Sequence, residues 1–187
     1  MSTRRQYLRT VGGAAALGSA ALAGCTGGGG DTGTLATRVS DQPGDISDFE
    51  SCLVTVAGVR VKPTDGELVK RDVEPTEVDL TELRGERSAL VAEEEFATGE
   101  YEFLQLRVTE TTGTLKSGEE ATVEVPGDAP LKFEKRFEIR AGERTTFTAD
   151  FTPVRAGRTG RYLLKPVADE VTVAYEGETA TGTGTGG

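Results

Sequence analysis

The sequence predicts an all-β domain over residues 34–175, built as an antiparallel β-sandwich of about eight or nine strands. Three observations support this fold class. Apolar residues recur with a period of two, Gly and Pro turn signals recur about every ten residues, and no long stretch has the apolar spacing of an amphipathic helix. We therefore expect short strands joined by tight turns, with no long helix in the domain.

The first part of the domain begins with alternation over residues 35–39, followed by a turn over residues 41–45. A long strand is expected over residues 49–61. Within it the pair Ala57-Gly58 shifts the phase of the inward positions, which predicts a β-bulge. A second turn, over residues 62–66, ends this strand.

The rest of the domain is expected to contain shorter strands. Two of them, at residues 68–69 and 78–80, lie on either side of Pro75, and a single helical turn is expected within residues 81–90. Five further strands are expected at residues 101–109, 122–125, 131–139, 145–151 and 162–175. Pro166 lies inside the last strand, which places it at a sheet edge or a bulge.

Two strands begin with the same local pattern, Gly-x-Tyr, at residues 99–101 and 160–162. A glycine supplies a tight turn, and the following tyrosine can pack at the corner with its hydroxyl bonded to backbone, as in the tyrosine corner of sandwich domains. The alternative is that these are two unrelated hairpin turns.

The N-terminal residues 1–24 have the features of an export signal. The run Thr3-Arg4-Arg5-Gln6-Tyr7-Leu8-Arg9 resembles the twin-arginine signal, in which Arg4 and Arg5 are the defining pair. The run that follows is rich in Ala and Gly and is shorter than the ~20 apolar residues that a membrane-spanning helix needs. A removable signal is therefore expected.

The signal ends in Leu22-Ala23-Gly24-Cys25, which resembles the lipobox of lipoproteins. The resemblance implies that the Cys25 thiol carries a lipid and that residues 25–33 form a short Gly-rich tether to the membrane. The alternative is an ordinary thiol after a simple secretory signal. The Gly/Thr-rich residues 176–187 are expected to form a disordered tail.

The composition is strongly acidic. Removal of residues 1–24 would take away three arginines and no acid, which leaves 18 basic and 31 acidic residues and a net charge of −13. Such a surface repels nucleic acid, so no nucleic-acid partner is expected. The excess of acids, together with 15 Arg against 6 Lys, is typical of a halophilic archaeon; an ordinary acidic secreted protein is the alternative.

Several kinds of catalytic site are excluded by residue type. The chain has no His, so it cannot form a Ser-His-Asp triad, a Cys-His pair or a His-ligated zinc site. If Cys25 is lipidated, Cys52 is the remaining thiol, and its alternation with Val54 and Val56 predicts a buried, inert side chain.

Carboxylates are the remaining candidate ligands. Asp41, Asp45, Asp48 and Glu50 lie within ten residues on an expected turn. Calcium takes six to eight oxygen ligands, which acids and backbone carbonyls of one loop can supply, so these four form a candidate calcium site. Their spacing does not fit an EF-hand, and a solvated acidic face is the alternative. The acidic run at residues 93–95 is expected to be a hydrated loop.

Several segments together resemble the DUF4382 domain, in the order in which that family carries them. These segments are residues 34–43, 54–61, 78–83, 97–106, 150–151 and 160–167. The similarity extends from Gly33 to about Val173. The sequence departs from the pattern in having Gln42 between Asp41 and Pro43 and in lacking an aromatic residue in the 64–72 loop. The resemblance implies a lipoprotein domain of unknown function with a fold like transthyretin or the carboxypeptidase regulatory domain.

These features predict an exported, lipid-anchored β-sandwich on the extracellular face of the cell membrane. We expect a binding or structural module rather than an enzyme, with the membrane and an unknown surface protein or polysaccharide as partners. No cofactor other than calcium is expected. The alternative is an extracytoplasmic carboxylate-based hydrolase, using acids such as Asp41 and Asp45, or a calcium-dependent accessory domain.

Overall fold

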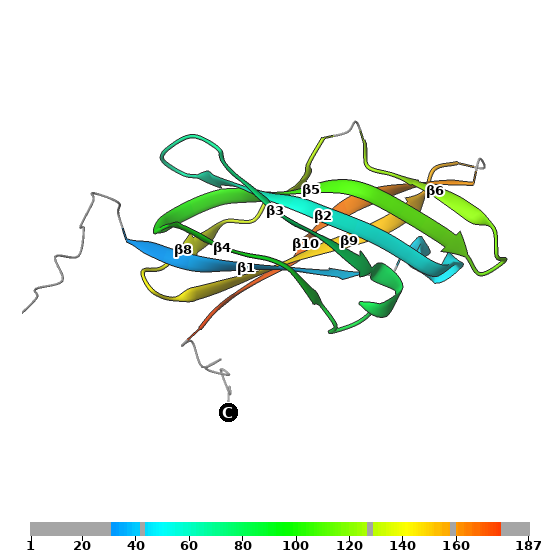
Figure 1. Ribbon diagram of the computed structural model, residues 1–187, viewed down its shortest axis with the longest axis horizontal. Helices are drawn as coiled ribbons and strands as arrows, with labels where there is room; N and C mark the ends of the chain where they lie inside the picture. The colour runs from blue at the N-terminus through cyan, green and yellow to red at the C-terminus, as the bar shows by residue number, and fades with distance from the viewer. Residues whose placement is uncertain (1–30, 42–43, 127–128, 158–159, 177–187) are drawn as a thin grey trace, which may run out of the picture.

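A computed structural model describes residues 31–41, 44–126, 129–157 and 160–176, which form strands and two short 3-10 helices (Figure 1). In chain order the elements are β1 (Thr32–Asp41), η1 (Asp45–Asp48), β2 (Phe49–Pro63), β3 (Val69–Asp79), η2 (Leu80–Glu82), β4 (Ala89–Ala97), β5 (Gly99–Leu115), β6 (Glu120–Glu124), β7 (Leu131–Phe133), β8 (Phe137–Ile139), β9 (Arg144–Arg155) and β10 (Arg161–Tyr175). The all-β fold class is therefore confirmed. The expected signal, with Arg4 and Arg5, the lipidation candidate Cys25, most of the tether and nearly all of the tail lie outside the described residues.

The strands form one continuous hydrogen-bonded path in the order β3-β2-β5-β6-β10-β9-β1-β4, and β7 and β8 also pair with β5. Figure 1 shows two layers, with β2, β3 and β5 in one and β1, β4, β9 and β10 in the other. Strand β6 pairs with both β5 and β10 and so joins the layers. The ends of the path also meet, because the Arg71 guanidinium of β3 lies 5.3 Å from the Phe96 ring centroid of β4. The sheet is therefore nearly closed and barrel-like.

The predicted antiparallel sandwich is not confirmed, because the sheet is mixed. Strand β1 runs parallel to β9 over eight residues of each strand, and β6 runs parallel to β10. The remaining pairs are antiparallel. Alternation of apolar and polar residues shows that a segment is a strand, but it does not show which partner the strand has or in which direction that partner runs.

The inward positions of both layers share one apolar core. Its largest fully buried side chains are Tyr162, Phe49, Phe96, Phe133, Phe147 and Phe151. The Phe49 ring of β2 meets the Tyr162 ring of β10 edge to face, with centroids 4.6 Å apart, so aromatic packing connects the two layers.

Cys52 lies in this core as a free thiol with no exposed surface, as its alternation predicts. Burial, and to a smaller extent the nearby carboxylates of Asp79 and Asp41, raise the pKa of the thiol to about 12. A thiol in this environment remains protonated and unreactive at neutral pH.

Several local features that the sequence predicts in the long strands β2, β5 and β10 are present in the structure. The register of β2 shifts between Val56 and Gly58 against both of its neighbours, which confirms the predicted bulge. Both Gly-x-Tyr glycines have positive φ, 139° at Gly99 and 71° at Gly160. The Tyr101 hydroxyl donates to the backbone carbonyl of Ala97 at 2.7 Å, as in a tyrosine corner, whereas Tyr162 bonds to side chains instead.

Four predictions about individual elements are wrong. The two short strands around Pro75 are a single strand, β3, at one end of the sheet path, where a missing N–H is tolerated. The helical turn is limited to η2, and the segment expected to be a hydrated acidic loop is strand β4. The strand expected at residues 131–139 is divided into β7 and β8.

Strand β4 is the other end of the path. Its acidic run predicts a hydrated loop, and the structure shows why a strand can carry these acids here. Glu93 and Glu95 are exposed, and Glu93 pairs with Arg144 of β9 at 2.6 Å. Charged side chains on an edge strand hinder edge-to-edge association, so an acidic run is compatible with a strand at this place. No helix in the described part of the chain is long and apolar enough to cross a membrane.

Gly113 of β5 tests the packing between the layers. A Cβ atom at this position would lie 2.7 Å from Cε1 of Phe49 and 3.1 Å from the carbonyl oxygen of Ala121. Gly113→Ala is therefore expected to lower the free energy of unfolding by ~1–3 kcal/mol in urea denaturation, as overpacking does. The exposed neighbour Thr112 provides the control, since Thr112→Ala should cost less than ~1 kcal/mol. Equal midpoints for Gly113→Ala and the parent protein would contradict the packing.

Candidate functional site

The acids singled out in the sequence gather at one end of the domain, but they do not converge on one point. Asp45 and Asp48 begin and end η1, and both are tied to Arg155 of β9. The backbone N–H of Arg155 donates to Asp45 Oδ2 at 2.7 Å, and its Nη2 donates to Asp48 Oδ2, also at 2.7 Å. The Tyr162 hydroxyl donates to the same Asp48 oxygen at 2.9 Å. These contacts fix η1 against β9 and β10.

The fourth acid, Glu50, is exposed at the start of β2. Among the described residues, no group of three or more Cys, Asp or Glu side chains is placed to hold a metal ion. Asp45 and Asp48 already accept hydrogen bonds from the protein. The calcium hypothesis therefore has no support from the arrangement of its four residues and stays a prediction.

Asp41 differs from the other three because it is almost completely buried, at 1% exposure. It is the last residue of β1, opposite Phe151 of the parallel strand β9. Its backbone N–H donates to the Leu83 carbonyl at 3.4 Å, but neither oxygen of its carboxyl group has a hydrogen-bond partner among the residues that the structure describes. Buried polar groups nearly always have such a partner, so this carboxyl is unusual.

The surroundings of Asp41 raise its pKa to about 7. Burial is the main cause, because loss of water disfavours the ionised form. The Arg84 guanidinium opposes this shift, and the Asp150 carboxylate adds to it. The carboxyl group therefore changes its charge near neutral pH, which is common for groups at functional sites.

Asp41 borders a pocket of about 420 Å³, formed between the end of β1, η1 and the loop after η2. The described residues that line it are Asp41, Gly44, Ile46, Ser47, Arg84 and Gly85. Asp41 and Ile46 are buried, whereas Ser47 and Arg84 are exposed, and the Asp41 carboxyl oxygens have almost no accessible surface, so they lie behind the pocket wall. We call this space the Asp41 pocket.

Arg84 connects the two walls of the Asp41 pocket. Its Nη2 donates to the backbone carbonyl of Ile46 in η1 at 3.3 Å. The next residue, Gly85, has φ +73°, a conformation that favours glycine and turns the loop at the pocket mouth. Although Arg84 affects the pKa of Asp41, the two side chains form no ion pair.

One signal in the sequence does indicate that the Asp41 carboxyl is buried. Asp41 is in phase with Leu35, Thr37 and Val39, so the alternation of β1 continues through it and places it on the inward face. The turn that composition predicts over residues 41–45 is therefore wrong for Asp41, which is the last residue of β1. Arg84 and Ile46 carry no comparable signal, because they reach the pocket through the turn geometry of η1 and of the loop after η2.

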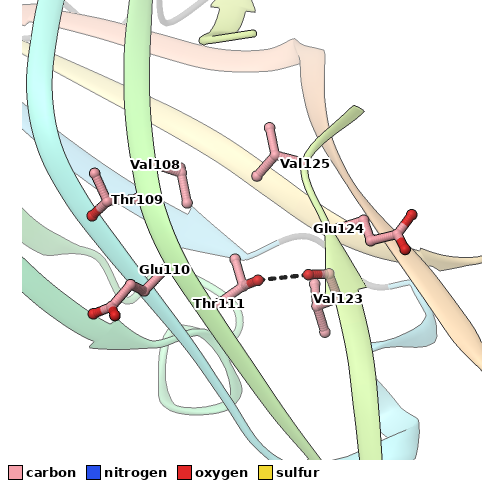
Figure 2. Close-up of a pocket in the computed structure, with 7 residues that line it drawn as sticks. All are labelled: Val108, Thr109, Glu110, Thr111, Val123, Glu124 and Val125. Carbon is pink, nitrogen blue, oxygen red and sulfur yellow. Dashed lines mark hydrogen bonds between the residues drawn. The ribbon is translucent and has the colours of Figure 1, made fainter. Parts of the chain in front are cut away.

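A second hollow lies where β5 and β6 diverge, with a volume of about 560 Å³ (Figure 2). One hydrogen bond crosses it, from the Thr111 hydroxyl to the Val123 carbonyl at 2.5 Å. Figure 2 shows the carboxylates of Glu110 and Glu124 pointing away from the space between the strands. Neither of these two carboxylates is therefore directed into this hollow.

Asp41→Asn tests the charge of the buried group through stability. Because the pKa is about 7 in the folded chain and near its ordinary value of 3.8 in the unfolded chain, the folded state binds the extra proton between these values, and stability falls as pH rises from about 4 to about 7. Asn cannot ionise. Relative to the parent protein, Asp41→Asn should therefore gain on the order of 3–4 kcal/mol between pH 4 and pH 8.

Urea denaturation at pH 4, 6 and 8 and at one salt concentration measures this difference. The matched control is Glu50→Gln, which removes the charge of an exposed acid at the same end of the domain. A difference between Asp41→Asn and the parent protein that does not change with pH would contradict the assignment.

One comparison with known proteins gives a match. A family model described as "Domain of unknown function (DUF4382)" matches residues 32–166, which runs from the start of β1 into β10 and includes the whole Asp41 pocket. No curated protein matches the chain. Since the match covers well over half of the sequence, the chain belongs to the DUF4382 family.

Proposed function

We propose that this chain is an exported, lipid-anchored module that binds a partner or ligand at the outer face of the cell membrane. The observation that carries the proposal is the succession of two N-terminal signals: the twin-arginine run around Arg4 and Arg5, then Leu22-Ala23-Gly24-Cys25. Two lipid chains on Cys25 would give firm attachment, whereas one chain gives marginal binding.

The start of the domain fits this arrangement. Strand β1 begins at Thr32, so six residues separate it from Cys25. A Gly-rich chain of this length reaches only ~15 Å by random-coil scaling, which keeps the domain close to the membrane surface. The net charge of −13 left after removal of residues 1–24 disfavours nucleic acid as a partner and favours a halophilic setting, where salt screens the acids.

A binding or structural role also agrees with the position of the carboxylates. The hydrolase alternative needs two acids that face one substrate, as in carboxylate-based glycosidases. The side chain of Asp45 is held by the Arg155 backbone, and Asp45 is not among the residues that line the Asp41 pocket. Asp41 is therefore the one acid among the described residues that line the pocket, and its oxygens are shielded from solvent, which does not suit acid–base catalysis.

Cys25→Ala tests the anchor. Loss of the lipidated thiol should move the protein from the membrane pellet to the soluble fraction, and the released domain should remain folded because Cys25 precedes β1. Cell fractionation after a high-pH wash, followed by immunoblotting, measures the distribution.

Cys52→Ala provides the matched control, because it removes a buried thiol within β2 and should leave the protein with the membrane. If the Cys25→Ala protein also stays in the washed pellet, the lipid-anchor proposal is wrong.

A further inference from the structure

One outer face of the sheet gathers basic side chains, although the chain as a whole is acidic. The residues on either side of Arg60, Gln105 and Lys132 are buried and apolar, so these three side chains point away from the core. Together with their neighbours on β2, β3 and β5, the outward positions carry five bases, which we call the basic face: Arg60, Lys62, Lys70, Arg107 and Lys132.

The bases occupy neighbouring positions in the sheet. Arg60 of β2 lies directly opposite Lys70 of β3 on one side and Gln105 of β5 on the other. Gln105 in turn lies opposite Lys132 of β7. Because adjacent strands are ~4.8 Å apart, this row is about 14 Å long. Like charges directly opposite one another destabilise a sheet, so folding does not explain why Arg60 faces Lys70.

Two of the five bases have charges that the domain leaves available. Arg107 and Lys132 each pair with one acid, and the Lys62 ammonium group donates to two backbone carbonyls. By contrast, neither the Arg60 nor the Lys70 side chain has a hydrogen bond or an ion pair with any residue that the structure describes. Both can therefore bind an anion from outside the domain.

The charge of this layer changes sign along its strands. Beyond the bulge of β2, Glu77 of β3 and Glu110 of β5 lie opposite Thr55, so that half of the face is acidic. The bases lie in the other half, toward the β2–β3 turn and the start of β5, and Figure 1 shows β1 starting at this same end. There the Asp31 carbonyl accepts from the N–H of Thr98, just before β5. The chain thus enters the domain at the basic end.

We propose that the basic face lies against an anionic membrane surface, with Arg60 and Lys70 bound to lipid phosphate groups. This inference rests on the proposed lipid anchor and adds the side on which the domain lies. The six residues between Cys25 and β1 reach only ~15 Å, and Gln105 is ~20 Å along β5 from its start, so the face can meet the surface. A lipid chain and a basic patch together give stable membrane attachment.

A lipid surface fits the basic face better than a polysaccharide does. The Phe103 ring lies on this face, but the Lys132 ammonium group is 4.2 Å from its centroid, so the ring is not free to stack on a sugar. The row of bases is also at the end of the domain where the tether enters. Attachment there gives the face a high effective concentration of lipid, so that even weak contacts are made.

The acidic net charge opposes attraction to such a surface from a distance, but not contact with it. The charge of −13 left after removal of residues 1–24 acts over distances that salt screens, since the Debye length is ~3 Å at 1 M. A guanidinium and a phosphate at hydrogen-bond distance keep part of their attraction under the same conditions. Salt therefore removes the repulsion by distant acids before it removes the contact.

Attachment of the mature chain to lipid vesicles tests the contact. Residues 25–187 contain every residue of the core. The Cys25 thiol can be coupled to a maleimide lipid, whereas the Cys52 thiol is buried and stays protonated. The vesicles are phosphatidylcholine alone or an equal mixture of phosphatidylcholine and phosphatidylglycerol. Acetylation by an uncharged N-hydroxysuccinimide ester, followed by mass spectrometry, measures how accessible each lysine is.

On the anionic vesicles we expect acetylation of Lys70 and Lys132 to be at least about threefold slower than on the neutral ones. Each base beside an anionic surface favours contact by about fivefold, so the two free bases together favour it by about thirtyfold. Two other lysines serve as internal controls: Lys116 follows the far end of β5, and Lys165 is exposed on β10 in the other layer. Their rates should not change.

Two double variants assign the protection to the basic face. Arg60→Gln with Lys70→Gln removes both available charges and should return Lys132 to the rate seen on neutral vesicles. Arg87→Gln with Arg161→Gln is the control, because it removes two exposed charges from the opposite end of the domain and should leave the protection intact. Circular dichroism and thermal unfolding establish that each variant is folded.

The proposal would be overturned if Lys70 and Lys132 were acetylated equally fast on both kinds of vesicle, or if the folded Arg60→Gln, Lys70→Gln protein kept its protection. It would equally be overturned if dissolved alginate, an acidic polysaccharide, protected these lysines on neutral vesicles more than the anionic lipid does. Maleimide coupling supplies the attachment whether or not the cell lipidates Cys25. Failure of the contact proposal therefore leaves the fractionation result unaffected and is distinguishable from failure of the anchor.

Discussion

The parallel pairing of β1 with β9 is the constraint on which the rest of the domain depends. It joins the first strand of the domain to one that lies over 100 residues later, and β4 pairs with the other edge of β1. With both edges occupied, β1 is a central strand, and Leu35, Ala36 and Val39 have no exposed surface. The same pairing continues to the last residue of β1 and carries the Asp41 carboxyl into the interior.

The elements around Asp41 are held together by hydrogen bonds of neighbouring side chains, and the Asp41 carboxyl takes part in none of them. Asp48 joins η1 to Arg155 and Tyr162, and Arg84 joins the loop after η2 to η1. These contacts hold η1 and the loop after η2 against the end of β1, where both Asp41 carboxyl oxygens are shielded from solvent. Burial of this carboxyl without a hydrogen-bond partner among the described residues lowers stability, so folding alone does not explain its presence.

Much of the architecture follows from residues whose effect is local. The phase shift at Gly58 produces a bulge, and Gly99 of the first Gly-x-Tyr pattern adopts a positive φ. Both could be predicted because the backbone geometry at these positions depends on the glycine itself. The parallel partner of β1 could not be predicted in this way, since pairing depends on distant residues. Strand β4 was missed because its acids suggested a solvated loop. The Asp41 pocket could be predicted only in part. The sequence offers Asp41 as a candidate site residue, but the burial of Asp41 and its proximity to Arg84 depend on the tertiary structure.

The pKa of Asp41 tests the central claim most directly, because the pairing of β1 with β9 buries that one carboxyl group. It can be measured in the full chain by following the side-chain carboxyl carbon with NMR across a pH titration, with Asp41→Asn used to assign the signal. The structure predicts a midpoint of about 7. A midpoint near the ordinary value of 3.8 would show that the group is solvated or paired, and would contradict the account.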